Sequence, residues 1–246
     1  MRLALVGGEE FADGFEDVHA DLLAANGGKK GVFLPSAATD DGLSTVQYWC
    51  NLACKRLSID GMQVEAPAVV DAASANDART AQLVADADWI YLGGGKPHVA
   101  MRVLGDSKVM AALLDSARRG ALIIGASAGA MMMCTQSIVL TDAVMGKIEA
   151  GFRQAKAGKG QQPEIPWFPC LNFVPDSVCL PHFNRPYAHG FLDIPHPGFR
   201  FIGIDEQTAL TNVFNGGWEV RGRGSVVLVG QDNQQTRYKS GEKLVL

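Results

Sequence analysis

Hydrophobic and polar positions alternate along the first half of the chain in blocks of strand and helix length. Short apolar runs at 2–8, 31–35, 89–92 and 121–124 predict strands. Between them, apolar residues recur at helical spacing in a polar stretch that ends at 25 and over 44–57, 77–87, 98–104 and 107–119. Continuous apolar runs separated by helices are typical of a parallel sheet that is covered on both faces. We therefore expect an α/β fold.

The pattern changes after about residue 140. Residues 147–170 are rich in Gly, Lys, Gln and Pro without a clear period, and we expect a long irregular loop there. A strand is expected over 62–70, interrupted by Pro67, and further short strands follow the loop at 177–181, 199–204, 207–210, 218–220, 225–229 and 244–246. The strands from residue 199 onward read as an antiparallel extension of one sheet edge. No linker divides the chain, so residues 1–246 are expected to form a single domain.

Composition and charge narrow the classes of partner. The 246 residues carry a net charge of −4 without a Lys/Arg-rich run, which argues against nucleic acid and anionic membranes as partners. No apolar run is long enough to span a bilayer, and the first one is too short for a secretory signal. The five cysteines lack zinc-finger or C-x-x-C spacing, so we expect reduced thiols in a cytoplasmic protein that holds no metal or other cofactor. The sequence allows a homodimer and does not fix the oligomeric state.

A serine lies between two glycines in the segment Ile123–Cys134, IIGASAGAMMMC. An apolar strand precedes Ser127, and a helix-compatible run begins at Ala128. Small residues at such a corner let the two backbones pack closely, so that the serine projects above the carboxyl edge of the sheet. The first amides of the helix then stabilise negative charge beside it. The competing interpretation is an ordinary turn in which Ser127 caps the helix.

A second loop of small residues, Gly93–Gly94–Gly95, follows the strand at 89–92. Its amides complete an oxyanion hole with the amide of Ala128, if the two loops meet at the same edge of the sheet. The alternative, a phosphate-binding turn, lacks the spacing of either common glycine-rich motif.

A nucleophilic serine needs a base and a third group that orients the base. Among the five histidines, His182 is best placed because it ends the apolar run 177–181. His19 is expected to face solvent, and His98 to cap a helix or face the substrate. His189 and His196 lie in a polar, Pro-flanked region, and their spacing of seven from His182 matches no usual zinc pattern. The adjacent acids Asp205 and Glu206 follow a strand and point to opposite faces, so only one of them can reach His182.

With these residues in place, the chain resembles the cyanophycinase and peptidase E (aspartyl dipeptidase) family. The matching pieces are Gly93–Gly95, the turn at 125–130, His182–Phe183–x–Arg185, and the segment 203–210, in the family's order. The resemblance implies a class I glutamine amidotransferase-like, flavodoxin-like doubly wound fold. It also implies a serine peptidase that acts on a small peptide or isopeptide bond, with an acidic residue beside that bond as one option. The absence of a cysteine nucleophile and of an H-x-E pair separates the chain from true glutamine amidotransferases.

The resemblance assigns roles to individual residues. Ser127 resembles the nucleophile, His182 the base and Glu206 the orienting acid, with backbone groups of Gly94 and Ala128 as the oxyanion hole. Gly95, Lys96, His98 and Arg185 are then expected at the substrate pocket. Arg185 is a candidate to hold a substrate carboxylate, or else to brace a loop through a salt bridge.

Two departures keep alternatives open. Gly95–Lys96–Pro97–His98 stands where cyanophycinases carry other residues, so cyanophycin itself is not expected as the substrate. Pro181 before His182 resembles the aspartyl dipeptidase branch, in which the acid follows the serine's helix, and this leaves Asp142 and Asp205 as rivals of Glu206. The second hypothesis for the whole chain is a module of the same fold that binds or deamidates a small metabolite.

Overall fold

The largest sheet has five parallel strands at its centre and one side. In this computed structural model, which describes residues 1–156, 166–186, 188, 198–214, 216–230 and 234–246, the strand order is β14-β11-β10-β1-β5-β4-β2-β3. The parallel strands are β1 (Arg2–Val6), β5 (Leu122–Ala126), β4 (Trp89–Leu92), β2 (Lys30–Leu34) and β3 (Gln63–Glu65). The antiparallel strands are β10 (Thr208–Thr211), β11 (Trp218–Gly222) and β14 (Lys243–Leu244). The expected α/β fold with an antiparallel extension is confirmed.

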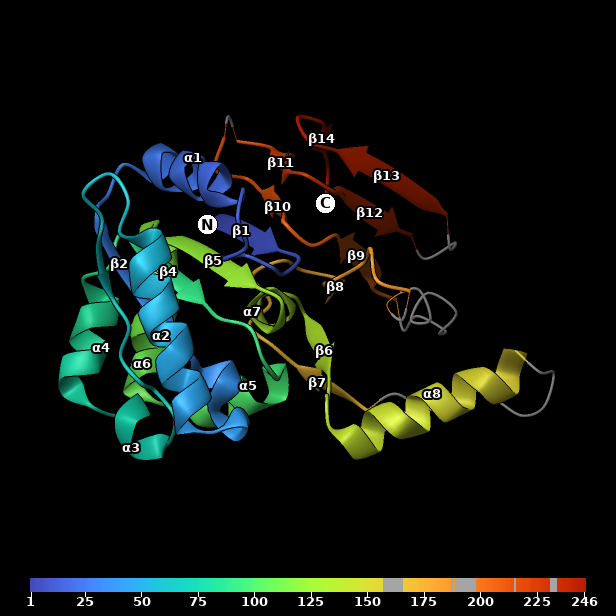
Figure 1. The fold of residues 1–246 in the computed structure, drawn as a ribbon, viewed down its shortest axis with the longest axis horizontal. Helices are drawn as coiled ribbons and strands as arrows, with labels where there is room; N and C mark the ends of the chain where they lie inside the picture. Colours follow the sequence, from blue (N-terminus) through green and yellow to red (C-terminus); the bar gives the residue numbers. More distant parts are fainter. Residues whose placement is uncertain (157–165, 187, 189–197, 215, 231–233) are drawn as a thin grey trace.

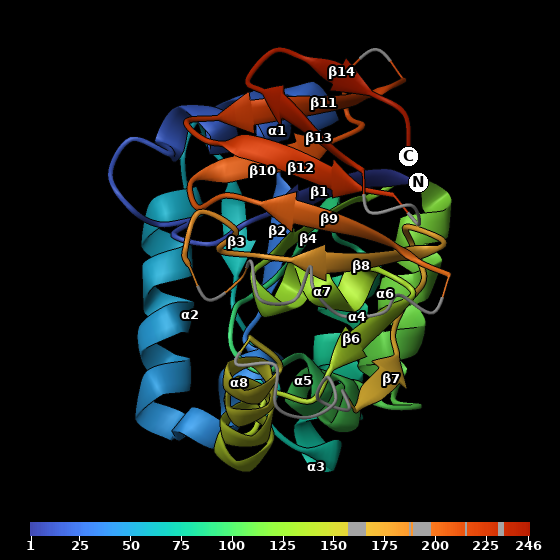
Figure 2. The ribbon, with the colours of Figure 1, turned by 90° about the vertical axis from the view of Figure 1, so that its right-hand side faces the viewer.

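Helices cover both faces of this sheet, as Figures 1 and 2 show. α1 (Glu16–Asn26) and α2 (Leu43–Leu57) lie on one face, and α3 (Ala72–Ala75), α4 (Ala78–Ala85), α5 (Pro97–Leu104), α6 (Lys108–Arg119) and α7 (Ala128–Met133) lie on the other. Alternation along β1 divides the core, because Ala4 and Val6 pack toward α1 while Leu3 and Leu5 pack toward the second group. Both faces of the strands are buried, which explains their continuous apolar runs.

Local signals fix the ends of several helices. Ser107 accepts a hydrogen bond from the Met110 amide at the start of α6, and Gly120 adopts the left-handed conformation that ends it. Asp77 caps α4 through the Thr80 amide. These caps lie where the sequence pattern predicts helix boundaries.

A second sheet contains strands that the sequence pattern assigned to the edge of the first. Its order is β13-β12-β9-β8, formed by β8 (Ser177–Leu180), β9 (Arg200–Ile204), β12 (Ser225–Val229) and β13 (Gln235–Lys239), with β8 parallel to β9. Only β10, β11 and β14 extend the first sheet, so the expectation of one shared edge is wrong for the rest. The sequence pattern also did not predict β13, which is mostly exposed and therefore lacks an apolar run.

The irregular loop expected over 147–170 is wrong for most of the residues described there. α8 spans Asp142–Lys156, and β7 (Trp167–Pro169) pairs with β6 (Gln136–Ile138). Two glycines, at 146 and 151, interrupt the helical pattern, but most other residues of α8 are good helix formers. Residues 157–165 lie outside the described part of the chain. Figure 1 shows α8 extending away from the two sheets.

Two smaller expectations are also corrected. The strand expected over 62–70 ends at Glu65, before Pro67, and a 3-10 helix, η1 (Ser36–Asp41), follows β2. His19 does not face solvent: its side chain is buried with Leu22 and Leu23, the residues three and four positions later on the same face of α1. Its Nε2 lies 3.2 Å from the Tyr91 hydroxyl, and burial lowers the pKa of His19 to about 4.

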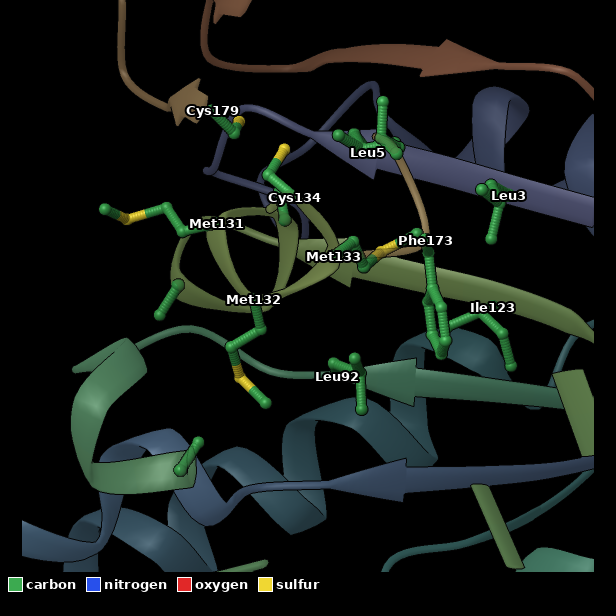
Figure 3. Close-up of a cluster of buried hydrophobic side chains, with 14 of the residues drawn as sticks. Leu3, Leu5, Leu92, Ile123, Met131, Met132, Met133, Cys134, Phe173 and Cys179 are labelled. Atoms are coloured by element: carbon green, nitrogen blue, oxygen red, sulfur yellow. The ribbon is translucent and has the colours of Figure 1, made fainter. Parts of the chain in front are cut away.

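α7 lies inside the core, and every residue of it is buried. Figure 3 shows Met131, Met132 and Met133 among Leu92, Phe173 and neighbouring apolar side chains. All five cysteines are free thiols, and burial raises the pKa of Cys50 to about 11 and that of Cys170 to about 12. Within the described ranges, none of the helices has the length and apolar character that a bilayer span requires.

Candidate active site

Ser127 occupies a strained corner between β5 and α7. Its φ of 49° and ψ of −111° are rare for a residue with a side chain, and its amide donates to the Val6 carbonyl at 2.9 Å. The hydroxyl makes no capping bond to α7. The interpretation of Ser127 as an ordinary helix cap is therefore wrong.

The glycines on either side of Ser127 allow the corner to form. A Cβ at Gly125 would lie 2.5 Å from the backbone of Gly129, and a Cβ at Gly129 would lie 2.1 Å from the Leu92 carbonyl oxygen. Both contacts are far shorter than van der Waals distance, so neither position accepts a side chain. The small residues bring β4, β5 and α7 together beneath the serine.

His182 follows β8 and reaches Ser127 across the top of β1. Its amide donates to the Gly7 carbonyl at 2.7 Å, and its ring lies against Gly8, where an added Cβ would lie 2.2 Å from Cε1. Its Nε2 lies 3.0 Å from Ser127 Oγ. The two side chains, 55 positions apart in the chain, are thus within hydrogen-bonding distance.

Glu206 holds the other nitrogen of the ring. His182 Nδ1 lies 2.8 Å from Glu206 Oε1, Arg185 Nε donates to both carboxylate oxygens at 2.9 and 3.0 Å, and Asn184 donates to Oε2 at 3.2 Å. Burial raises the pKa of Glu206, but these hydrogen bonds outweigh burial and lower the pKa to about 2. A carboxylate at this nitrogen favours a proton on Nδ1 and leaves Nε2 free to accept the Ser127 proton.

The two rival acids lie elsewhere. Asp205 points to the opposite side of the chain, as expected for neighbours on a strand, and accepts a hydrogen bond from the Ser225 amide at 2.9 Å. Asp142 begins α8, and no contact between it and His182 is present in the described part of the chain. Among the three acids, only Glu206 meets the imidazole.

The glycine loop after β4 lies beside the serine. A Cβ at Gly94 would lie 3.6 Å from Ser127 Cβ, and one at Gly95, whose φ is 132°, would lie 2.3 Å from the Ala37 carbonyl oxygen. Ala128 is the first residue of α7, where amides lack partners within the helix. Gly94 and Ala128 therefore both border the serine.

The expected substrate residues have different positions. Gly95 lines the cavity next to Ser127, whereas Lys96 Nζ lies 3.4 Å from Asp41. His98 accepts a hydrogen bond from the Leu140 amide at 3.3 Å, and Arg185 pairs with Glu206. Arg185 thus takes the bracing role of its two alternatives, although its partner is the Glu206 side chain.

The residues that the sequence pattern missed line the same cavity, which has a volume of about 440 Å³. They are two acids directly after β1, aromatic residues of the following turn and of α2, and their neighbours: Glu9, Glu10, Phe11, Ala12, Ala38, Asp41, Tyr48, Trp49 and Leu52. The sequence offered one signal for the two acids. In folds of this kind β1 and β5 are parallel neighbours, so the residues that follow β1 lie at the same edge of the sheet as Ser127, which follows β5. Among the described residues, no group of three or more His, Cys, Asp or Glu side chains is arranged to hold a metal ion.

Known proteins resemble this chain in sequence family and in fold. The family model described as "Peptidase family S51" matches residues 3–216. Among solved structures, a peptidase from an acI-B1 Actinobacterium has a TM-score of 0.80 and 23% identity, over 100% of this chain and 96% of that one. A protein of Listeria monocytogenes EGD-e, described as a candidate peptidase E, has a TM-score of 0.60 and 19% identity, over 91% and 98%. A search of curated proteins gave no significant match.

Proposed function

Because this chain belongs to peptidase family S51 and is a hydrolase of the serine peptidase class, we propose that it cleaves small peptides or isopeptides with Ser127, His182 and Glu206. The observation that carries the assignment is the pair of distances at His182, 3.0 Å to Ser127 Oγ and 2.8 Å to Glu206 Oε1. A nucleophile, a base and an orienting acid in this order are the parts that acyl transfer requires.

The reaction proceeds in two halves. Ser127 Oγ attacks the scissile carbonyl carbon while His182 Nε2 takes the hydroxyl proton, and the Gly94 and Ala128 amides stabilise the oxyanion. The C–N bond then breaks, and His182 returns the proton to the leaving amine. Water, deprotonated by the same nitrogen, attacks the acyl ester and releases the acid and the free serine. Glu206 stays ionised throughout, which its pKa of about 2 supports.

The backbone strain at Ser127 supports the same assignment. Unfavourable dihedral angles persist where the surrounding structure enforces them, and they are frequent at reactive groups. His182 also has a positive φ, 53°, so both members of the pair are held in unusual conformations. The five free thiols support a reducing, cytoplasmic location as part of this proposal.

A fluorophosphonate probe tests the nucleophile, and a dipeptide and isopeptide library, with Asp-X and isoaspartyl members, tests the reaction. We expect the probe to label the unmodified protein at Ser127 and to leave Ser127→Ala unlabelled. We expect at least one member of the library to be hydrolysed by the unmodified protein only. Equal labelling of both proteins would contradict the assignment of Ser127. Tight binding of a small metabolite, with no hydrolysis across the library, would favour a non-peptidase module.

A further inference from the structure

The cavity beside Ser127 and His182 is acidic and aromatic. Of the side chains that line it, three are carboxylates and three are aromatic rings, namely Glu9, Glu10, Asp41, Phe11, Tyr48 and Trp49. His182 is the one lining residue with a basic side chain among those described. A cavity of about 440 Å³ is within the range of sites for small ligands. Its lining therefore carries information on the charge of the substrate.

Among the acids that line the cavity, Glu10 lies near the reacting groups. Its side chain is only 7% exposed, and its Oε1 lies 3.8 Å from the Cβ position of Gly94, the glycine that also borders Ser127. Burial holds the pKa of Glu10 above its ordinary value, and a hydrogen bond from its own backbone amide and the charge of His182 offset this only in part. The carboxyl group thus lies on the serine side of the cavity, in a part of the lining that is almost closed to solvent.

Glu10 lacks the partners that Glu206 has. Arg185, His182 and Asn184 all donate to Glu206, whereas no other side chain among the described residues forms a hydrogen bond or ion pair with Glu10. A buried carboxylate without a counter-charge is unfavourable, and a ligand that brings a positive charge removes this cost. Asp41, by contrast, has Lys96 at 3.4 Å.

The aromatic residues of the cavity also favour a positively charged ligand. The Phe11 and Trp49 ring centroids are 6.4 Å apart, and those of Trp49 and Tyr48 are 5.4 Å apart, so the rings form a continuous wall. Aromatic faces attract ammonium and guanidinium groups, Trp most strongly. A cavity that combines a buried carboxylate with aromatic walls is suited to binding an organic cation.

We propose that this cavity binds a positively charged nitrogen of the substrate, an ammonium or guanidinium group near the scissile bond, with Glu10 as its counter-ion. The proposal rests on the proposed function and names the class of substrate within it. It replaces the acidic neighbour that the family resemblance implies, because Arg185, the residue offered for such a group, pairs with Glu206. The charge comes either from the peptide's N-terminal amine or from a Lys or Arg side chain.

Binding to Ser127→Ala, measured by calorimetry, tests the proposal without depending on turnover. The ligands are dipeptides that contain arginine or its neutral isostere citrulline, each with a free or an acetylated N-terminus, and Asp and Asn dipeptides for comparison. We expect at least about tenfold tighter binding of the charged member of one matched pair. Loss of affinity on acetylation identifies the N-terminal amine, and loss on exchange for citrulline identifies the side chain. Equal affinities in both pairs, or a preference for Asp over Asn, would overturn the proposal.

The same measurements with Glu10→Gln added identify the counter-ion. We expect the charge preference to fall to less than about twofold, while Glu65→Gln, an exposed acid outside the cavity, keeps it. Because Glu10 is buried without a partner side chain, its replacement should not lower Tm, which separates loss of recognition from loss of fold. A preference that survives in Glu10→Gln would reject Glu10 as the counter-ion. Failure of the peptidase assignment is distinct, since it would appear as missing probe labelling at Ser127.

Discussion

The two ends of the parallel strands carry polar hollows of similar size but different construction. At the amino end, a cavity of about 330 Å³ is lined by Arg2, Asn26, Asp88, Arg119 and their neighbours, and at the carboxyl end lies the cavity of about 440 Å³ beside Ser127. At the amino end, Arg2 donates to the Asn26 side chain at 2.9 Å, and Asp88 accepts from the Lys30 amide at 2.9 Å. These polar groups stabilise the fold by satisfying one another.

The carboxyl end is strained and incompletely matched instead. Four residues with side chains have positive φ there, namely Glu9, Ser127, His182 and Gln207, and no non-glycine residue that lines the amino-end cavity does. Glu10 is buried there without a partner side chain among the described residues. Under the proposed function, enforced strain and unmatched charge distinguish the catalytic end, whereas polarity and volume do not.

The largest effect that distinguishes the two ends is expected at the serine. Ser127→Ala should reduce kcat by about 10⁴-fold or more, since no other group can form the acyl ester. The measurement is the initial rate on whichever library peptide the unmodified protein cleaves. Arg119→Ala, at the amino end, is the matched control and should leave kcat within about twofold. Comparable losses in both variants would remove the functional distinction between the two ends.

The next effect separates two adjacent carboxylates at the same end. Glu206→Gln should lower kcat by about 10²- to 10⁴-fold, because the amide no longer stabilises a positive His182 or fixes its tautomer. Asp205→Ala should change kcat by no more than a few fold but lower the free energy of unfolding by about 1–3 kcal/mol, because the Ser225 amide loses its acceptor. Steady-state rates and urea titrations check the pair, and the reverse pattern would move the orienting role to Asp205.

A smaller effect, on stability, is expected from His19, which packs beneath the carboxyl-end cavity. Its ring contacts Phe11, with the two ring centroids 5.9 Å apart. The pKa of His19 is about 4 when folded and about 6.5 when unfolded, so below pH 6.5 the unfolded chain binds a proton that the folded chain does not. Stability should therefore fall by roughly 3 kcal/mol as the pH drops from 6.5 to 4. Urea titrations over this range should show a smaller fall in His19→Gln, and parallel curves would contradict the neutral, buried state of His19.

The smallest effect belongs to the matched polar groups at the amino end. Arg2→Ala removes hydrogen bonds to the Asn26 side chain and to backbone carbonyls, and should lower the free energy of unfolding by about 1–2 kcal/mol. Urea titration measures the change, and kcat should be unaffected. A loss of activity in the folded variant would show that the two ends are coupled.

Much of the fold could be predicted from the sequence because its signals are local. Continuous apolar runs and helix caps place most of the parallel strands and helices within a few residues of their observed bounds. The glycines around Ser127 indicate a tight corner. The split into two sheets could not be predicted, since residues 199–229 have the same strand pattern in either sheet. α8 was missed because its glycines interrupt the period of the pattern.

The candidate site also has residues that could be predicted from the sequence and residues that could not. Ser127, His182 and Glu206 each follow an apolar strand, so their shared edge could be inferred from strand order and family resemblance. Glu10 follows β1 and was open to the same inference, whereas Trp49 was not, because it lines the cavity only through the packing of α2. His19 was misplaced because a histidine in a polar stretch carries no sign of a buried tyrosine partner 72 positions away.

The hydroxyl of Ser127 comes from the first sheet, while the imidazole of His182 and the carboxylate of Glu206 follow strands of the second. During synthesis, the ribosome adds the serine 55 residues before the histidine, and β13, the last strand of the second sheet, comes after both. A nascent chain therefore carries an alcohol without its base. If the proposed mechanism holds, the order of the strands alone keeps the chain inactive until both sheets have formed.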